Sequence, residues 1–112
     1  MLDINIMTYI AYIIKQESMP KNKWTFITNH AAVLTLLDRE NNLTAREIAL
    51  TLDITERSVH RIIKDLESAG YIAKRKEGRE NRYTVNKELP LRRNDQREVS
   101  VYELIQLISQ KR

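Results

Sequence analysis

Basic side chains line one face of a helix that the sequence predicts between Thr55 and Ala69. At about 100° per residue, the apolar side chains of this helix gather on one side and the opposite side is mostly basic. The apolar side consists of Val59, Ile62, Ile63 and Leu66, and the opposite side of Arg57, Arg61, Lys64 and Ser68, flanked by His60. Arginine and lysine donate hydrogen bonds to phosphates and to the acceptors of guanine. A helix that is merely solvated also carries charge on its wet side, so this face alone does not decide between the two roles.

A second group of basic side chains follows in a predicted β-hairpin. Between residues 74 and 82, five basic residues stand against Glu77 and Glu80, which gives a local charge of +3. The five are Lys74, Arg75, Lys76, Arg79 and Arg82. Arg79 follows the turn residue Gly78 and is expected to enter a DNA minor groove, while the other four are expected to meet phosphates. The alternative is an exposed hairpin that carries charge only to keep its edges from aggregating.

Two short amphipathic helices joined by a tight turn must position the first group. Thr44 and Glu47 have the spacing of a capping box and predict a helix start, after which apolar residues recur at helical spacing up to Leu52. Two residues then separate this helix from the next, which Thr55 is expected to cap. Gly70 is well placed to end the second helix, because glycine adopts the left-handed backbone conformation without a Cβ penalty.

Further segments complete the predicted fold. Thr28 is expected to cap a helix over 29–40, and residues 71–86 favour a hairpin. Helical apolar patterns also cover 3–17 and 99–110. The chain has only two Gly and two Pro in 112 residues, which argues against a many-turned β-sandwich. The sequence predicts a mainly α fold with a small β-hairpin, α+β overall.

The stretch from about Trp24 to Asn86 resembles a winged helix-turn-helix domain of the MarR-like bacterial transcription regulators. LTAREIALTLDITERSVHRIIKDLESAGYI is similar to their helix-turn-recognition-helix unit, and KRKEGRENRYTV is similar to their wing. The resemblance implies that residues 55–69 form the recognition helix. It also implies groove-facing or backbone-facing positions for Thr55, Arg57, Ser58, His60, Arg61 and Lys64, and a wing-tip position for Arg79. The sequence departs from the common pattern at Asp53, where the turn often has glycine, but Asp tolerates the left-handed region better than most residues.

These features predict a transcriptional regulator that binds a specific sequence in double-stranded DNA. The recognition helix would enter the major groove, and the wing, residues 74–82, would contact the minor groove or the backbone. A net charge of +4 agrees with a polyanionic partner. The rival prediction is a winged-helix adaptor that binds acidic protein surfaces without reading a DNA sequence. The expected domains are an N-terminal helix in 1–20, the DNA-binding domain in 24–87, and a connector with a C-terminal helix in 88–112.

The two terminal helices have apolar faces broader than one small domain needs. Packing them across a two-fold axis would form a homodimer, although they could also complete the monomer core or dock on another protein. The family resemblance implies that a small-molecule effector could bind between such helices and the winged domain. The aromatic residues available to line that pocket are Tyr9, Tyr12, Trp24, Phe26 and Tyr102, and core packing is their alternative role.

Several classes of function are excluded or disfavoured by what the sequence lacks. There is no cysteine and no glycine-rich phosphate loop, and the two histidines, His30 and His60, fall on different predicted helices. No catalytic constellation, metal site or cofactor is therefore expected. His30 is interpreted as an ordinary first-turn residue. The N-terminal apolar run is too short to span a bilayer and lacks a basic leader, so a cytoplasmic protein without membrane contact is expected.

Overall fold

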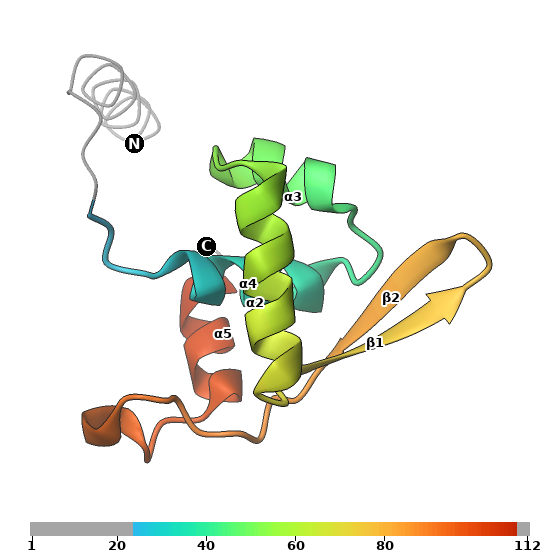
Figure 1. The fold of residues 1–112 in the computed structure, drawn as a ribbon. Coiled ribbons are helices and arrows are strands. Elements are labelled where there is room, and N and C mark those ends of the chain that lie inside the picture. The colour runs from blue at the N-terminus through green and yellow to red at the C-terminus, as the bar shows by residue number, and fades with distance from the viewer. Residues whose placement is uncertain (1–23, 110–112) are drawn as a thin grey trace, which may run out of the picture.

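A computed structural model describes residues 24–109 of the chain (Figure 1). Its elements are α2 (Asn29–Arg39), α3 (Ala45–Leu52), α4 (Glu56–Ser68), β1 (Ile72–Glu77), β2 (Glu80–Val85), a 3-10 helix η1 (Asn94–Gln96) and α5 (Val101–Ser109). The helix expected over 3–17 lies outside the described residues. The mainly α fold with a two-stranded hairpin is confirmed, and its arrangement is that of a winged helix-turn-helix.

Side-chain caps mark the starts of α2, α3 and α4 at the residues that the sequence predicted. The Thr28 hydroxyl accepts a hydrogen bond from the Ala31 amide at 3.1 Å and opens α2. At the start of α3, the Thr44 hydroxyl accepts from the Glu47 amide at 3.1 Å, and the Glu47 carboxylate accepts from the Thr44 amide at 2.8 Å. Each such cap satisfies amides that a helix start leaves unpaired. Helix starts are therefore encoded locally in this chain.

The turn between α3 and α4 determines how α4 is oriented relative to α3. Asp53 caps α3 in the left-handed conformation, with φ 58° and ψ 47°. It is the non-glycine residue with positive φ in the part of the chain that the structure describes. The Ile54 amide donates to the Ala49 carbonyl at 3.1 Å and closes the turn. Aspartate thus replaces the glycine that such turns often use, as the sequence predicted.

A single hydrophobic core joins the three central helices, the base of the hairpin and α5. The core side chains are Val33, Leu34, Leu37, Ile48, Ala49, Val59, Ile62, Ile63, Leu66, Tyr71, Ile72, Tyr83, Val101 and Ile105. The predicted apolar stripe of α4 is buried throughout. Because the apolar residues of α4 all lie on one side, only that side packs into the core. The opposite, basic side is therefore exposed to solvent.

The hairpin projects away from the helical body (Figure 1). Gly78, with φ 63°, is the first of two turn residues, and Arg79 is the second. Cross-strand pairing runs from Ile72 opposite Val85 to Glu77 opposite Glu80. Because side chains alternate along a strand, Lys74 and Lys76 share the face of the buried Ile72, and the other charged pairs occupy the reverse face. This alternation divides the cationic group that the sequence treated as one.

The connector after the hairpin is more ordered than its sequence suggested. Pro90 forms an isolated bridge with Ser100, and the Leu91 amide donates to the Val99 carbonyl at 2.9 Å. The Tyr71 hydroxyl donates to the Pro90 carbonyl at 2.6 Å and ties this connector to the core. Helix α5 begins at Val101, two residues later than the expected 99, since Val99 lies in a bend and Ser100 pairs with Pro90. No helix in the described part of the chain is long and apolar enough to cross a membrane.

Candidate nucleic-acid interface

The solvent side of α4 presents the basic side chains that the sequence assigned to it. Arg57, His60, Arg61 and Lys64 are all exposed, while Val59 on the opposite side is fully buried. None of these four forms an ion pair with another residue in the range 24–109. An unpaired cation on a rigid helix can bind an anion without first breaking an internal contact. The face is therefore available to a polyanionic partner.

Two hydroxyl residues that the resemblance placed on this face, Thr55 and Ser58, hydrogen-bond to each other at the start of α4. The Thr55 hydroxyl accepts from the Ser58 amide at 3.0 Å and donates to the Ser58 hydroxyl at 3.0 Å. Thr55 is exposed and Ser58 is half-buried. Their observed role is to cap α4, whose amino-terminal end favours negative charge through the helix dipole. A contact of either hydroxyl with DNA stays a prediction.

An open groove of about 560 Å³ lies between α4 and the hairpin. Four of the predicted site residues line it together: His60 and Lys64 from α4, and Lys74 and Arg79 from the hairpin. The lining also includes two acidic side chains, Glu67 and Glu80, polar residues of the α2–α3 loop, and apolar side chains such as Ile63. These loop residues are Asn42 and Thr44. The sequence did not assign them to a site, because Thr44 was interpreted only as a helix cap. The fold thus combines cations from two elements in one groove.

Tyr83 lies in the wall of this groove and is largely buried. Burial raises the pKa of the Tyr83 hydroxyl above its usual value, and the nearby negative charge of Glu67 raises that pKa further. A hydrogen bond with Asn81 acts in the opposite direction. The phenol therefore remains protonated at neutral pH and adds no negative charge to the groove.

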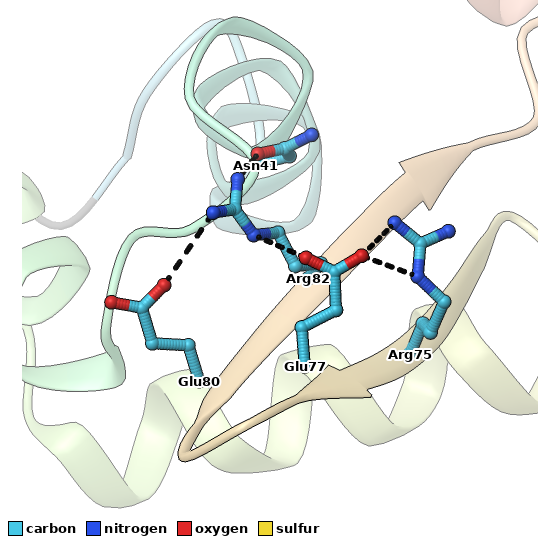
Figure 2. Close-up of polar contacts among 5 residues, drawn as sticks. All are labelled: Asn41, Arg75, Glu77, Glu80 and Arg82. Carbon is cyan, nitrogen blue, oxygen red and sulfur yellow. Dashed lines mark hydrogen bonds and ion pairs between the residues drawn. The ribbon is translucent and has the colours of Figure 1, made fainter.

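The remaining hairpin cations have different surroundings. Arg75 and Arg82 occupy the reverse face of the hairpin, where both contact the carboxylate of Glu77 (Figure 2). Lys76 lies on the same face as Lys74 and, among the described residues, has no ion pair. The sequence assigned all of these cations to phosphate contacts. The structure separates two paired arginines from the unpaired Lys74, Lys76 and Arg79.

A second, larger groove of about 930 Å³ lies on the other side of α4, between α2, the connector and α5. Of the aromatic residues proposed for a ligand pocket, Phe26 lines this groove, with Trp24 packed edge-on against it at 4.9 Å between ring centres. Tyr102 is half exposed and lies outside its lining, and Tyr9 and Tyr12 fall outside the described residues. The sequence missed Arg92 and Arg93, which also line the groove, because they fall in a segment without helical or strand periodicity.

His30, which the sequence treated as an ordinary first-turn residue, joins two helices at the rim of this larger groove. Its Nε2 lies 2.9 Å from Oδ2 of Asp65, so α2 and α4 are linked by a side-chain contact across 35 positions of sequence. No periodic signal connects residues so far apart. Among the described residues, no cluster of three or more acidic, histidine or cysteine side chains could hold a metal ion.

A protein-family model and several solved structures are similar to this chain. The sequence model described as MarR family matches residues 25–82. No protein with a curated description matches the chain. Among solved structures, a MarR family protein of Mycobacterium tuberculosis in complex with salicylic acid is similar, with 25% identity over 54% of this chain and 47% of that chain and a TM-score of 0.46.

Two other similar structures come from Lactococcus lactis and Staphylococcus aureus. ZitR of L. lactis in complex with DNA shares 18% identity over 74% of this chain and 64% of that chain, with a TM-score of 0.48. MepR, a transcription regulator of the S. aureus multidrug efflux pump MepA, shares 16% identity over 76% of this chain and 60% of that chain, with a TM-score of 0.47. The chain therefore spans less than two thirds of the length of each of these three proteins.

Proposed function

The chain belongs to the MarR family of transcription regulators, and from this premise we propose that it binds a specific sequence in double-stranded DNA. The observation that carries the proposal is the groove of about 560 Å³, whose two walls bring exposed cations of α4 and of the hairpin together. A duplex presents phosphates on both sides of its major groove, so cations on a helix and on a neighbouring hairpin can contact it at once. This role is one of binding and needs no catalytic group.

Each basic residue has a distinct part in the proposed complex. Arg57 and Arg61 lie on the exposed side of α4 and would read base edges in the major groove, where arginine pairs with guanine acceptors. Lys64 and His60, which line the groove between α4 and the hairpin, would contact the DNA backbone. The unpaired hairpin cations would grip the backbone or the minor groove, with Arg79 at the tip. Binding energy would come mainly from the backbone contacts and discrimination mainly from the two arginines.

The proposed function is tested by selecting bound sequences from a pool of random duplex DNA with the full chain. A DNA reader should enrich one sequence, and its affinity should fall steeply as salt rises, because each phosphate contact releases counterions. If two copies bind as a symmetric dimer, the enriched sites should be palindromic, with half-sites about 34 Å apart. Weak binding without enrichment at any salt concentration would identify the chain as an adaptor instead.

The dimer itself is part of the proposal. Tyr102 and Leu107 of α5 are 50% and 68% exposed, so an apolar part of this helix remains uncovered by the described residues. Covering such a face across a two-fold axis would bring two copies of α4 into one assembly. Sedimentation of the full chain at micromolar concentration measures its mass directly, and a monomer at all concentrations would rule the dimer out.

The larger groove is the proposed place for a small-molecule effector. Its walls include apolar side chains such as Leu34 and Leu66 together with Arg92 and Arg93. Arg93 is paired with Asp95, so Arg92 is the arginine that would meet a carboxylate. A compact apolar molecule with one carboxylate would fit such a lining. A panel of aromatic carboxylates should then raise the melting temperature of the free protein, since a ligand that binds only the folded state stabilises it. If none of these carboxylates changes the melting temperature at millimolar concentration, the proposed effector site is wrong.

Arg79→Ala is expected to weaken binding to most DNA sequences with little loss of discrimination. Arg79 is exposed at the hairpin tip and lines the shared groove, so its contribution is mainly electrostatic. The slope of log affinity against log salt should become shallower by about one unit. Arg97→Ala, which removes the same charge from the exposed connector outside that groove, serves as the control and should leave the slope unchanged. Equal effects of the two variants would indicate only a general charge effect.

A further inference from the structure

One carboxylate, that of Glu77, contacts two arginines on the reverse face of the hairpin (Figure 2). Arg75 donates from Nε to Oε2 of Glu77 at 2.9 Å, and its Nη2 donates to the same oxygen. The other oxygen, Oε1, lies 3.2 Å from Nε of Arg82. The second acid of the hairpin, Glu80, contributes less, because its Oε1 is 3.6 Å from Nη2 of Arg82. Glu77 is therefore the centre of the cluster.

The cluster is attached to the helical body through Arg82. Its Nη1 donates to the side-chain carbonyl of Asn41 at 3.3 Å, and the amide of the next residue, Tyr83, donates to the Asn41 backbone carbonyl at 3.1 Å. Asn41 lies just beyond the carboxyl end of α2, and Figure 2 shows its side chain above the guanidinium of Arg82. Two adjacent residues of β2 thus meet the α2–α3 loop at a single residue.

Strand register explains why the cluster depends on Glu77. Arg75 stands directly opposite Arg82, and Glu77 directly opposite Glu80. Like charges in directly opposed positions destabilise a strand pair. The diagonal contact between Glu77 and Arg82 offsets this repulsion, because it places a negative charge between the two arginines.

Arg82 is also the least exposed cation of the hairpin, with 36% of its side chain accessible. Its Nε is shielded from solvent and, among the described residues, has no well-aligned hydrogen bond. The Glu77 carboxylate at ion-pair distance is what compensates this nitrogen. Exposed ion pairs contribute little by themselves. Without Glu77, however, the partly shielded Arg82 guanidinium keeps only the longer carboxylate contact, with Glu80, and can pair more readily with another anion.

We propose that Glu77 is a positioning residue that determines DNA specificity by holding Arg75 and Arg82 away from DNA and fixing the wing against Asn41. The wing residues left for DNA are then Lys74, Lys76 and Arg79. This inference rests on the proposed function. Without Glu77, the two released arginines would bind any phosphate within reach, and the wing would lose its fixed angle to α4. Affinity for unrelated DNA would rise while preference for the proper site fell.

The test compares Glu77→Gln with Glu80→Gln in the full chain. Both variants remove one negative charge from the same face of the hairpin, but only the first removes the central contact. For Glu77→Gln, random duplex DNA should bind about 3- to 10-fold more tightly, and the salt slope should steepen by about one to two units, one for each released arginine. The ratio of specific to random affinity should fall. Glu80→Gln removes a carboxylate from the groove lining without releasing Arg75, so it should raise the affinities for the specific and the random duplex by a similar factor and leave their ratio unchanged.

Hydrogen exchange of the free protein provides a readout that does not involve DNA. The Tyr83 amide, which donates to Asn41, should exchange faster in Glu77→Gln than in wild type or Glu80→Gln. Glu77→Asp keeps the charge but shortens the side chain, so it should reproduce both the faster exchange and the lower affinity ratio. This variant also covers the case in which Glu77→Gln does not fold.

The outcomes separate this inference from the function on which it rests. If wild type prefers no DNA sequence but the Tyr83 amide responds only to Glu77 variants, the proposed function fails and the positioning role stands. If wild type prefers a sequence and the two glutamine variants behave alike in both measurements, the effect is one of net charge, and the role of Glu77 is overturned.

Discussion

Arg57→Ala and Arg61→Ala are each expected to reduce the discrimination between the selected DNA site and random duplex by about 1 to 3 kcal/mol, or about 5- to 150-fold. Both side chains are exposed on the side of α4 opposite the core. An arginine that pairs with both acceptors of a guanine loses this contact when the base changes, whereas a phosphate contact is insensitive to sequence. Alanine at either position should therefore reduce specific affinity much more than non-specific affinity.

The measurement is a pair of binding titrations at one fixed salt concentration, with the selected duplex and with a scrambled duplex. Arg97→Ala again provides a matched loss of charge outside the interface and should leave the ratio of the two affinities unchanged. The folded state should persist in both α4 variants, since neither side chain belongs to the core. If each variant weakens binding to the two duplexes equally, Arg57 and Arg61 contact only the backbone, and the sequence must be read elsewhere.

Leu37→Ala is expected to lower the free energy of unfolding by about 2 to 5 kcal/mol. Leu37 is a large side chain with no exposed surface, and it packs from α2 into the core that also holds the apolar side of α4. Removing its branched end takes away apolar contacts and leaves a cavity that the surrounding helices fill only in part. A typical domain is stable by about 5 to 15 kcal/mol, so the loss could unfold a substantial fraction of the molecules.

Urea denaturation followed by circular dichroism measures this change, and Leu50→Ala is the matched control. Leu50 lies on α3 with 73% of its surface exposed, so the same truncation there should change stability by less than about 0.5 kcal/mol. Both variants should retain the wild-type dependence of unfolding free energy on urea. Equal destabilisation by the two variants would contradict the assignment of the core around α2.

The parts of this protein that the sequence determined by itself are those encoded by neighbouring residues. The caps at Thr28, Thr44 and Thr55 and the left-handed turn at Asp53 each depend on contacts within a few positions, so their signals can be read without knowing the fold. The burial of one side of α4 follows from helical periodicity in the same way. The sequence therefore predicted the two helices with their tight turn, the hairpin and the exposed basic face of α4.

Only the tertiary structure determined which hairpin cations are free to bind an anion and which are paired with a carboxylate. The division between the unpaired Lys74 and the paired Arg82 depends on strand register, and the attachment of Arg82 to Asn41 joins residues 41 positions apart. The contact of His30 with Asp65 and the bridged connector are equally non-local. Such contacts depend on how complete elements pack, and residue spacing carries no information about them. Composition therefore determined the net charge of the hairpin, and packing determined which of its charged side chains are paired.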